Sequence, residues 1–266
     1  MIFVAGLPGT GKSLMVHQVA HLGVAAGRVV HLLQWDVARP LFEASEAGRR
    51  YPMVAGVTHP LIRKAVGLWS RRAITEWDRR CVGPEHVLVG ETPFVGNRLI
   101  ELARPMDDAA EPLLAARSCR FAIAVPSVEV RSFLEAERDR RMARPQHPRE
   151  REDAPPDVLR VLWRDLVAVA RALGITAQAP TLDGPMAYDP VIYRRVYEAV
   201  LRHRHVEILE LGTILPTSAL SVYDFAATCV DVVPDSAMAD AVVREIEARY
   251  PDAAVLSDDV TRWWAT

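Results

Sequence analysis

Short apolar runs recur along the chain, and five of them have the length and residue types of buried strands. They span residues 2–5, 28–35, 86–90, 120–125 and 206–211. Elsewhere, apolar residues recur three and four positions apart, as in amphipathic helices, notably from Leu61 to Trp77 and from Val191 to Leu201. This alternation predicts an α/β fold of three layers, in which helices cover a mostly parallel five-stranded sheet.

The glycine-rich segment after the first run carries the most specific signal in the chain. Residues 6–13 read GLPGTGKS and fill every fixed position of the phosphate-binding pattern G-x-x-x-x-G-K-[ST]. In such a loop, backbone N–H groups surround phosphate oxygens, the lysine reaches the outer phosphates and the last hydroxyl helps to hold Mg²⁺. Strand, loop and helix come in the required order, because residues 13–20 favour a helix. The predicted phosphate-binding residues are Gly9, Thr10, Gly11, Lys12 and Ser13.

Composition limits the class of protein. A chain of 266 residues that is 50% hydrophobic can bury the core of one α/β domain, so we expect 1–266 to be a single domain. The formal net charge of −2 argues against a protein that coats nucleic acid or an anionic membrane with positive charge. No apolar run approaches a membrane span, and the chain opens on a strand instead of a leader peptide. These features predict a soluble, cytoplasmic protein and leave its oligomeric state open.

Cysteine and histidine usage predicts no zinc site. Cys81, Cys119 and Cys229 are few, widely spaced and odd in number, which fits a reducing compartment and a role as small core residues. His203 and His205 would be neighbours on a strand edge, but no Cys or His pair elsewhere completes a zinc site with them.

Two carboxylates follow the second and third predicted strands. Asp36 would reach the ligand edge of the sheet, where it could accept a hydroxyl proton or orient a nucleophile; Trp35 and Arg39 would help to form that pocket. The alternative makes Asp36 the N-cap of the next helix. Glu91 resembles the Walker B acid that supports Mg²⁺ beside a phosphate loop. Its alternatives are a helix cap, a solvated side chain or the catalytic base.

Further candidates surround this pocket. Asn97 and Arg98 lie in the turn after Glu91 and are predicted to contact the substrate. Residues 40–81 are mostly helical in pattern and would form a cap on the same side, with a helix beginning near His59 and Pro60. The basic residues of this cap could contact an anionic substrate, although we expect most of them on solvated helix faces; they are Arg49, Arg50, Arg63, Lys64, Arg71 and Arg72.

Residues 138–153 are crowded with arginine, acidic residues and proline. We interpret them as an exposed loop that closes over phosphate, in which Arg138, Arg141 and Arg144 would neutralise phosphoryl charge. A mixed-charge linker is the alternative. Arginine runs are less informative in this chain, because only Lys12 and Lys64 of its 32 basic residues are lysine.

The order of phosphate loop, Asp36, Glu91 and arginine-rich segment resembles the P-loop small-molecule kinases, a superfamily that includes the nucleoside monophosphate kinases. The resemblance covers about residues 1–173 and is specific only in the loop. It implies that Gly9, Gly11, Lys12 and Ser13 bind ATP and Mg²⁺. It also implies that Asp36, Arg39 and Arg98 contact the acceptor, the molecule that receives the phosphoryl group. Arg138, Arg141 and Arg144 match the lid arginines of the family.

The chain departs from the adenylate-kinase pattern where Glu91 is followed by Thr92, Pro93 and Phe94, which favours another small metabolite as acceptor. The function expected is an ATP-dependent kinase. In phosphoryl transfer a protein chiefly positions the reactants and neutralises charge. The predicted catalytic residues are Lys12, Glu91, Asp36, Arg138 and Arg141. Two alternatives remain, a partner-regulated P-loop ATPase and a nucleotide-binding regulatory protein.

Overall fold

The computed structural model describes residues 1–54, 56–148, 150, 155–177, 186–214, 221 and 227–266. Its strands are β1 (Ile2–Ala5), β2 (Val29–Gln34), β3 (His86–Thr92), β4 (Arg120–Pro126), β5 (Val206–Leu211) and β6 (Val230–Asp231). Its helices are α1 (Lys12–Ala25), α2 (Trp35–Ala44), α3 (Pro60–Arg80), α4 (Glu111–Leu114), α5 (Val128–Ala143), α6 (Pro156–Ala172), α7 (Pro190–Val200), α8 (Ser236–Arg249) and α9 (Ala253–Thr261), with short 3₁₀ turns at Gly48–Arg50 and Ile100–Leu102.

The strands form one six-stranded sheet in the order β5-β4-β1-β3-β2-β6, and every neighbouring pair is parallel. The predicted α/β class and parallel sheet are confirmed, but the predicted count of five strands is wrong. The missed strand, β6, has only two residues, both exposed, and pairs His31 with Val230 and Leu32 with Asp231. So short and exposed a strand leaves no apolar pattern to detect.

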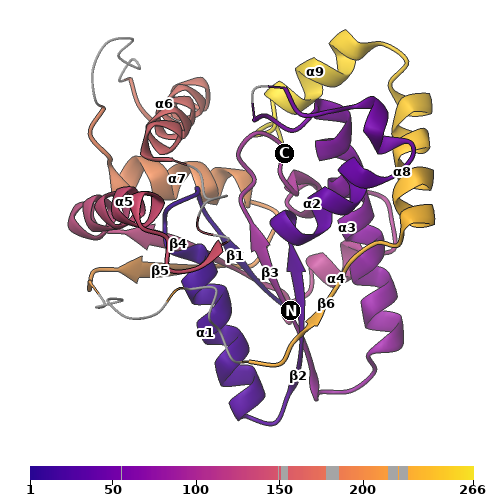
Figure 1. Cartoon of the computed structure of the whole chain (residues 1–266), viewed down its shortest axis with the longest axis horizontal. Coiled ribbons are helices and arrows are strands. Elements are labelled where there is room, and N and C mark those ends of the chain that lie inside the picture. The colour runs from indigo at the N-terminus through magenta and orange to yellow at the C-terminus, as the bar shows by residue number, and fades with distance from the viewer. Residues whose placement is uncertain (55, 149, 151–154, 178–185, 215–220, 222–226) are drawn as a thin grey trace.

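Side chains along the central strands point alternately to the two faces of the sheet, and helices cover both faces (Figure 1). In β1, Phe3 and Ala5 belong to one buried cluster and Val4 to another. The cluster around Val4 includes Val16 and Ala20 of α1, so α1 covers that face. Buried residues of α2, α3, α7, α8 and α9 join the larger cluster on the other face. The helices therefore hold the carboxyl edge of β1, β2 and β3 in place from both sides.

Capping residues and proline determine where some of the helices begin. His59 caps α3 by accepting a hydrogen bond from the Leu61 amide, and Pro60 opens the helix as predicted. The predicted cap over 40–81 is helical only in part: α2 begins earlier, at Trp35, and continues through Pro40. Between α2 and α3 lie the 3₁₀ turn Gly48–Arg50 and an isolated bridge. No described helix is both long and apolar enough to cross a membrane.

Candidate functional site

The glycine-rich loop joins the carboxyl end of β1 to the first turn of α1. Gly9 and Gly11 have φ angles of 73° and 81°, a region that favours glycine, and Gly11 immediately precedes α1. A Cβ atom on Gly9 would lie 2.7 Å from a methyl carbon of Leu159. Thr10 lies outside the open face of the loop, because its buried hydroxyl donates to the Leu7 carbonyl at 2.8 Å. The positive φ angles at Gly9 and Gly11 and the Thr10 hydrogen bond therefore define the shape of this loop.

Two buried residues from distant helices hold this loop, and sequence reasoning missed both. The Tyr193 hydroxyl of α7 accepts a hydrogen bond from the Leu7 amide at 3.2 Å. Burial raises the pKa of Tyr193, which keeps the hydroxyl protonated. Arg131 of α5 is 2% exposed and donates to the carbonyls of Pro8 and Gly9 at 3.2 and 3.1 Å. Tyr193 lies within the amphipathic pattern from Val191 to Leu201, which indicates a buried side chain but not its partner.

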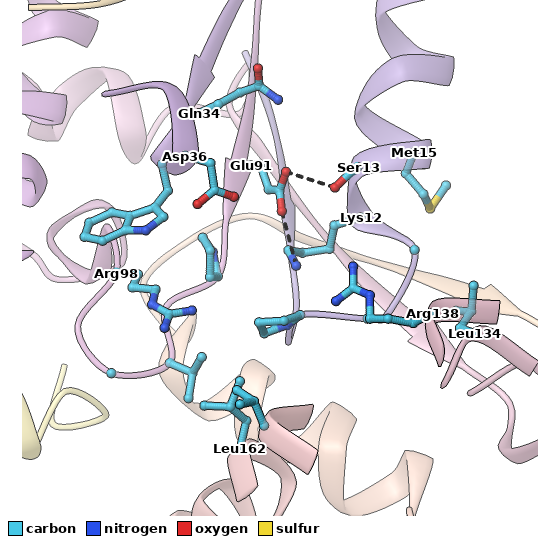
Figure 2. A pocket seen from close by; sticks show the side chains of 18 of the residues that line it. Lys12, Ser13, Met15, Gln34, Asp36, Glu91, Arg98, Leu134, Arg138 and Leu162 are labelled. Carbon is cyan, nitrogen blue, oxygen red and sulfur yellow. Dashed lines mark hydrogen bonds and ion pairs between the residues drawn. The ribbon is translucent and has the colours of Figure 1, made fainter. Parts of the chain in front are cut away.

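Lys12, Ser13 and Glu91 meet at the mouth of the loop (Figure 2). The Lys12 ammonium lies 3.3 Å from one Glu91 carboxylate oxygen and donates to the Leu7 carbonyl at 2.9 Å. The Ser13 hydroxyl donates to the other Glu91 oxygen at 3.4 Å. Burial lowers the pKa of Lys12, and the charge of Glu91 opposes that shift. Glu91 is within β3, paired with Val4 of β1, so the sheet register brings it beside the loop.

Asp36 and Arg98 line the same cleft. The N-cap of α2 is Gln34, and Asp36 lies in the first turn, so the alternative role of Asp36 as N-cap is wrong. Burial lowers the pKa of Arg98, and the nearby Asp36 carboxylate opposes the shift. Within the described residues, neither side chain forms a hydrogen bond or an ion pair. Both groups are therefore available to a ligand.

A second arginine adds positive charge to this side of the cleft. Arg63 of α3 donates to the carbonyls of Thr58 and Gly96 at 2.8 and 2.9 Å. Burial, together with the charge of Arg98, lowers the pKa of Arg63 to about 10. Arg63 is one of the six basic cap residues, most of which were expected on solvated helix faces, and it lies in the wall of the cleft. Two half-buried guanidinium groups close together favour an anionic ligand between them.

The other predicted acceptor-side residues have different surroundings. Trp35 is buried in the cleft wall, and Arg39 lies in the wall while pairing with Glu43 at 2.6 Å. Asn97 is fully buried, and its amide donates to Glu101 at 3.3 Å. The left-handed backbone at Asn97, with φ of 63°, turns this side chain into the core, away from the cleft.

The predicted lid is helical where it was expected to be a loop. Arg138, Arg140 and Arg141 lie within α5, which ends only at Ala143. Arg138 lines the cleft and points toward Lys12 (Figure 2), and Arg141 also lines the cleft, where it pairs with Glu150 at 2.7 Å. Arg144 follows the helix and is exposed, outside the cleft wall. Residues 149 and 151–154 of the predicted segment lie outside the described residues.

The cleft that these groups line has a volume of about 1800 Å³. That value exceeds the roughly 300–1,000 Å³ of an ordinary small-molecule pocket, and the cleft extends well beyond the glycine-rich loop. Apolar residues of α5 and α6, among them Leu134 and Leu162, form part of the wall near the loop. Charged groups thus meet at the centre of the cleft, with apolar surface beside them.

Comparisons with protein-family models, curated proteins and solved structures give no significant match to this chain. The arguments below therefore rest on the residues and their geometry.

Proposed function

We propose that this protein is a P-loop phosphotransferase that moves the γ-phosphoryl group of ATP to the hydroxyl or phosphate of a small molecule. The observation that carries the proposal is the presence of two chemically different groups of residues in one cleft. Lys12, Ser13 and Glu91 form the donor side, while Asp36 and Arg98 form the acceptor side. A protein that only binds a nucleotide has no need of the second group.

The donor side fits a nucleotide and Mg²⁺. The positive φ angles at Gly9 and Gly11 shape a loop whose backbone amides can surround phosphate oxygens. The Ser13 hydroxyl and the Glu91 carboxylate are 3.4 Å apart and supply the oxygen ligands that Mg²⁺ prefers. The Lys12 ammonium contacts Glu91 and the Leu7 carbonyl, and phosphate oxygens of a bound nucleotide can replace both of these partners. We propose the P-loop NTPase fold on the same grounds.

The acceptor side supplies a proton acceptor and positive charge. Bound ATP with Mg²⁺ would supply the phosphoryl group and neutralise much of its charge. Asp36 would accept the proton of an acceptor hydroxyl, because its carboxylate is exposed to the cleft and forms no hydrogen bond or ion pair with the described residues. Arg98 would orient the acceptor. Arg138, which points toward Lys12 from α5, would neutralise charge that develops on the phosphoryl oxygens.

The test is a screen of candidate metabolites with γ-labelled ATP. We expect one class of acceptor to become labelled and Lys12→Ala to abolish the labelling. Arg79→Ala is the control, because Arg79 is an exposed cation that pairs only with Glu76 within the described residues. Full turnover in Lys12→Ala would contradict the proposal. ATP consumption without a labelled acceptor would replace it with the partner-regulated ATPase.

A further inference from the structure

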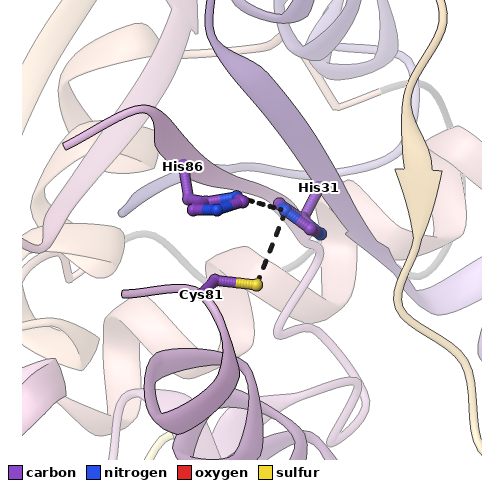
Figure 3. Close-up of side chains that lie close together, drawn as sticks. All are labelled: His31, Cys81 and His86. Carbon is purple, nitrogen blue, oxygen red and sulfur yellow. Dashed lines mark hydrogen bonds between the residues drawn. The ribbon is translucent and has the colours of Figure 1, made fainter. Parts of the chain in front are cut away.

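Three residues with metal-binding side chains lie close together near the amino ends of β2 and β3 (Figure 3). His31 lies in β2, His86 opens β3, and Cys81 is the C-cap of α3. The parallel register pairs Val29 with His86, so His31 lies two residues further along the neighbouring strand. The phosphate loop follows the carboxyl end of β1, whereas this group lies toward the amino ends of β2 and β3. The group is therefore separate from the proposed phosphotransfer site.

We propose that His31, Cys81 and His86 bind one divalent transition-metal ion of the zinc class. The three ligand atoms all lie within 4.8 Å of one another. His31 Nε2 is 3.2 Å from His86 Nδ1 and 3.7 Å from Cys81 Sγ. In a tetrahedral site with Zn–N of about 2.1 Å and Zn–S of about 2.3 Å, two nitrogens lie about 3.4 Å apart and nitrogen and sulfur about 3.6 Å. The two separations from His31 Nε2 are within about 0.2 Å of those values, and the third pair of ligand atoms, His86 and Cys81, lies within 4.8 Å.

The donor set distinguishes this site from the magnesium site proposed in the cleft. One thiol and two imidazoles suit zinc and related transition metals, while Mg²⁺ prefers oxygen ligands such as those of Ser13 and Glu91. Three protein ligands leave a fourth position for water or another ligand. Cys81 and His86 are half-buried, with the His86 side chain 23% exposed, so an ion can reach the group from solvent.

The surroundings of the cluster support metal binding. A Glu85 carboxylate oxygen lies 3.8 Å from His86 Nε2, the ring nitrogen that does not face His31; this is longer than a hydrogen bond but near enough for the exposed Glu85 side chain to move into contact. Ligating histidines commonly direct their second ring nitrogen at a carboxylate, which orients the ring and raises its basicity. Trp77 of α3 packs edge-on against His31 with ring centroids 5.9 Å apart, so one side of the group is apolar. A bound ion would link the end of α3 to β2 and β3.

The experiment titrates metal-free, reduced full-length protein with Co²⁺, a spectroscopic substitute for zinc, and then displaces it with Zn²⁺. We expect one equivalent to bind with a thiolate-to-cobalt charge-transfer band, and Zn²⁺ to remove the band and raise Tm. Cys81→Ser should abolish the band, and His86→Gln should weaken cobalt binding by at least 10-fold. Glu85→Gln should weaken it by about 10–100-fold, as loss of an outer carboxylate partner does in other metal sites.

Matched controls separate this cluster from other donors. Cys229→Ser removes another half-buried thiol, and the double variant His203→Gln and His205→Gln removes two histidines on the turn before β5. Both should keep the band and the wild-type affinity. Circular dichroism of each metal-free variant checks that it folds, and Cys81→Ser and His86→Gln test the site independently. Unchanged cobalt binding in both cluster variants, or a band that disappears in either control, would overturn the proposal.

Discussion

At the scale of single residues, buried polar side chains determine the shape of the phosphate loop. Its Leu7 amide and its Pro8 and Gly9 carbonyls pair with Tyr193 and Arg131, which come from α7 and α5. A buried backbone group without a partner is costly, so these contacts constrain the loop before any ligand arrives. The loop is therefore organised by tertiary contacts as well as by its glycines.

Tyr193→Phe tests this organisation. The change leaves the buried Leu7 amide without its acceptor, which should cost about 1–3 kcal/mol of the free energy of unfolding and weaken nucleotide binding. Denaturant unfolding and nucleotide titration measure the two effects. Tyr197→Phe is the matched control, because its buried hydroxyl donates to the Pro93 carbonyl instead of contacting the loop. The control should lose stability but keep its nucleotide affinity; equal affinity losses would contradict the assignment.

Asp36 provides a second test at this scale. If its carboxylate accepts the acceptor proton, Asp36→Asn should lower kcat by the roughly 10²–10⁴-fold that general base catalysis contributes, with little change in ATP affinity. Steady-state kinetics with the identified acceptor and ATP titration separate these quantities. Asp78→Asn, an exposed change on α3, is the control. Parallel losses of rate and ATP affinity would make Asp36 a binding residue.

At the scale of elements, a buried ionic group connects α3 to the short helix α4 and to the turn before β5. Arg71 of α3 pairs with Asp108 at 2.6 Å and with Glu111 at 2.9 Å. Arg204, whose side chain is fully buried, pairs with Glu111 at 2.8 Å. Helix α4 has only four residues and is too short to be stable by itself, so the ion pairs with Arg71 and Arg204 fix its position.

The Glu111 pairs predict acid sensitivity. Burial by itself would raise the pKa of Glu111, but hydrogen bonds from Arg204 and Arg71 lower it from 4.5 to about 2. Because the folded protein binds this proton less tightly than the unfolded chain, the stabilisation is complete above about pH 4.5. It is lost as the pH falls toward 2. Urea unfolding between pH 7 and pH 2.5 should show a weaker dependence on pH in Glu111→Gln. Parallel curves for the variant and the wild type would contradict this account.

At the scale of the whole molecule, the two proposed sites lie toward different ends of the sheet. Its carboxyl edge carries the cleft, and the amino ends of β2 and β3 carry the proposed metal site. The central strands β1 and β3 have buried residues on both faces, so the two ends share a rigid core. Ligands at the two ends should therefore stabilise the same folded state independently.

Thermal unfolding tests this independence. ATP with Mg²⁺ at about 100 times its Kd should stabilise the wild type by about 2.7 kcal/mol, and Lys12→Ala should lose most of that effect. Cys81→Ser should retain the full ATP effect while losing the Zn²⁺ effect. An ATP shift that depends on Cys81 would show that the two ends are coupled.

Much of the fold and the donor side of the site follow from local sequence. Periodicity predicts strands β1 to β5, glycine geometry predicts the loop from Gly6 to Ser13, and capping predicts the start of α3 at Pro60. All three signals act over a few residues. The position of Glu91 follows from the same rule, because parallel strands end at a common edge. By themselves these signals determined the α/β class and the candidate phosphate site.

Tertiary structure decided which distant side chains meet. Helix packing brings Tyr193 to the loop and Arg63 beside Arg98. The left-handed backbone at Asn97 excludes its side chain from the cleft. The meeting of His31, Cys81 and His86 depends on the β2–β3 register and on where α3 ends. Contacts between residues 50 or more positions apart leave no periodic signal, because packing of the whole chain creates them.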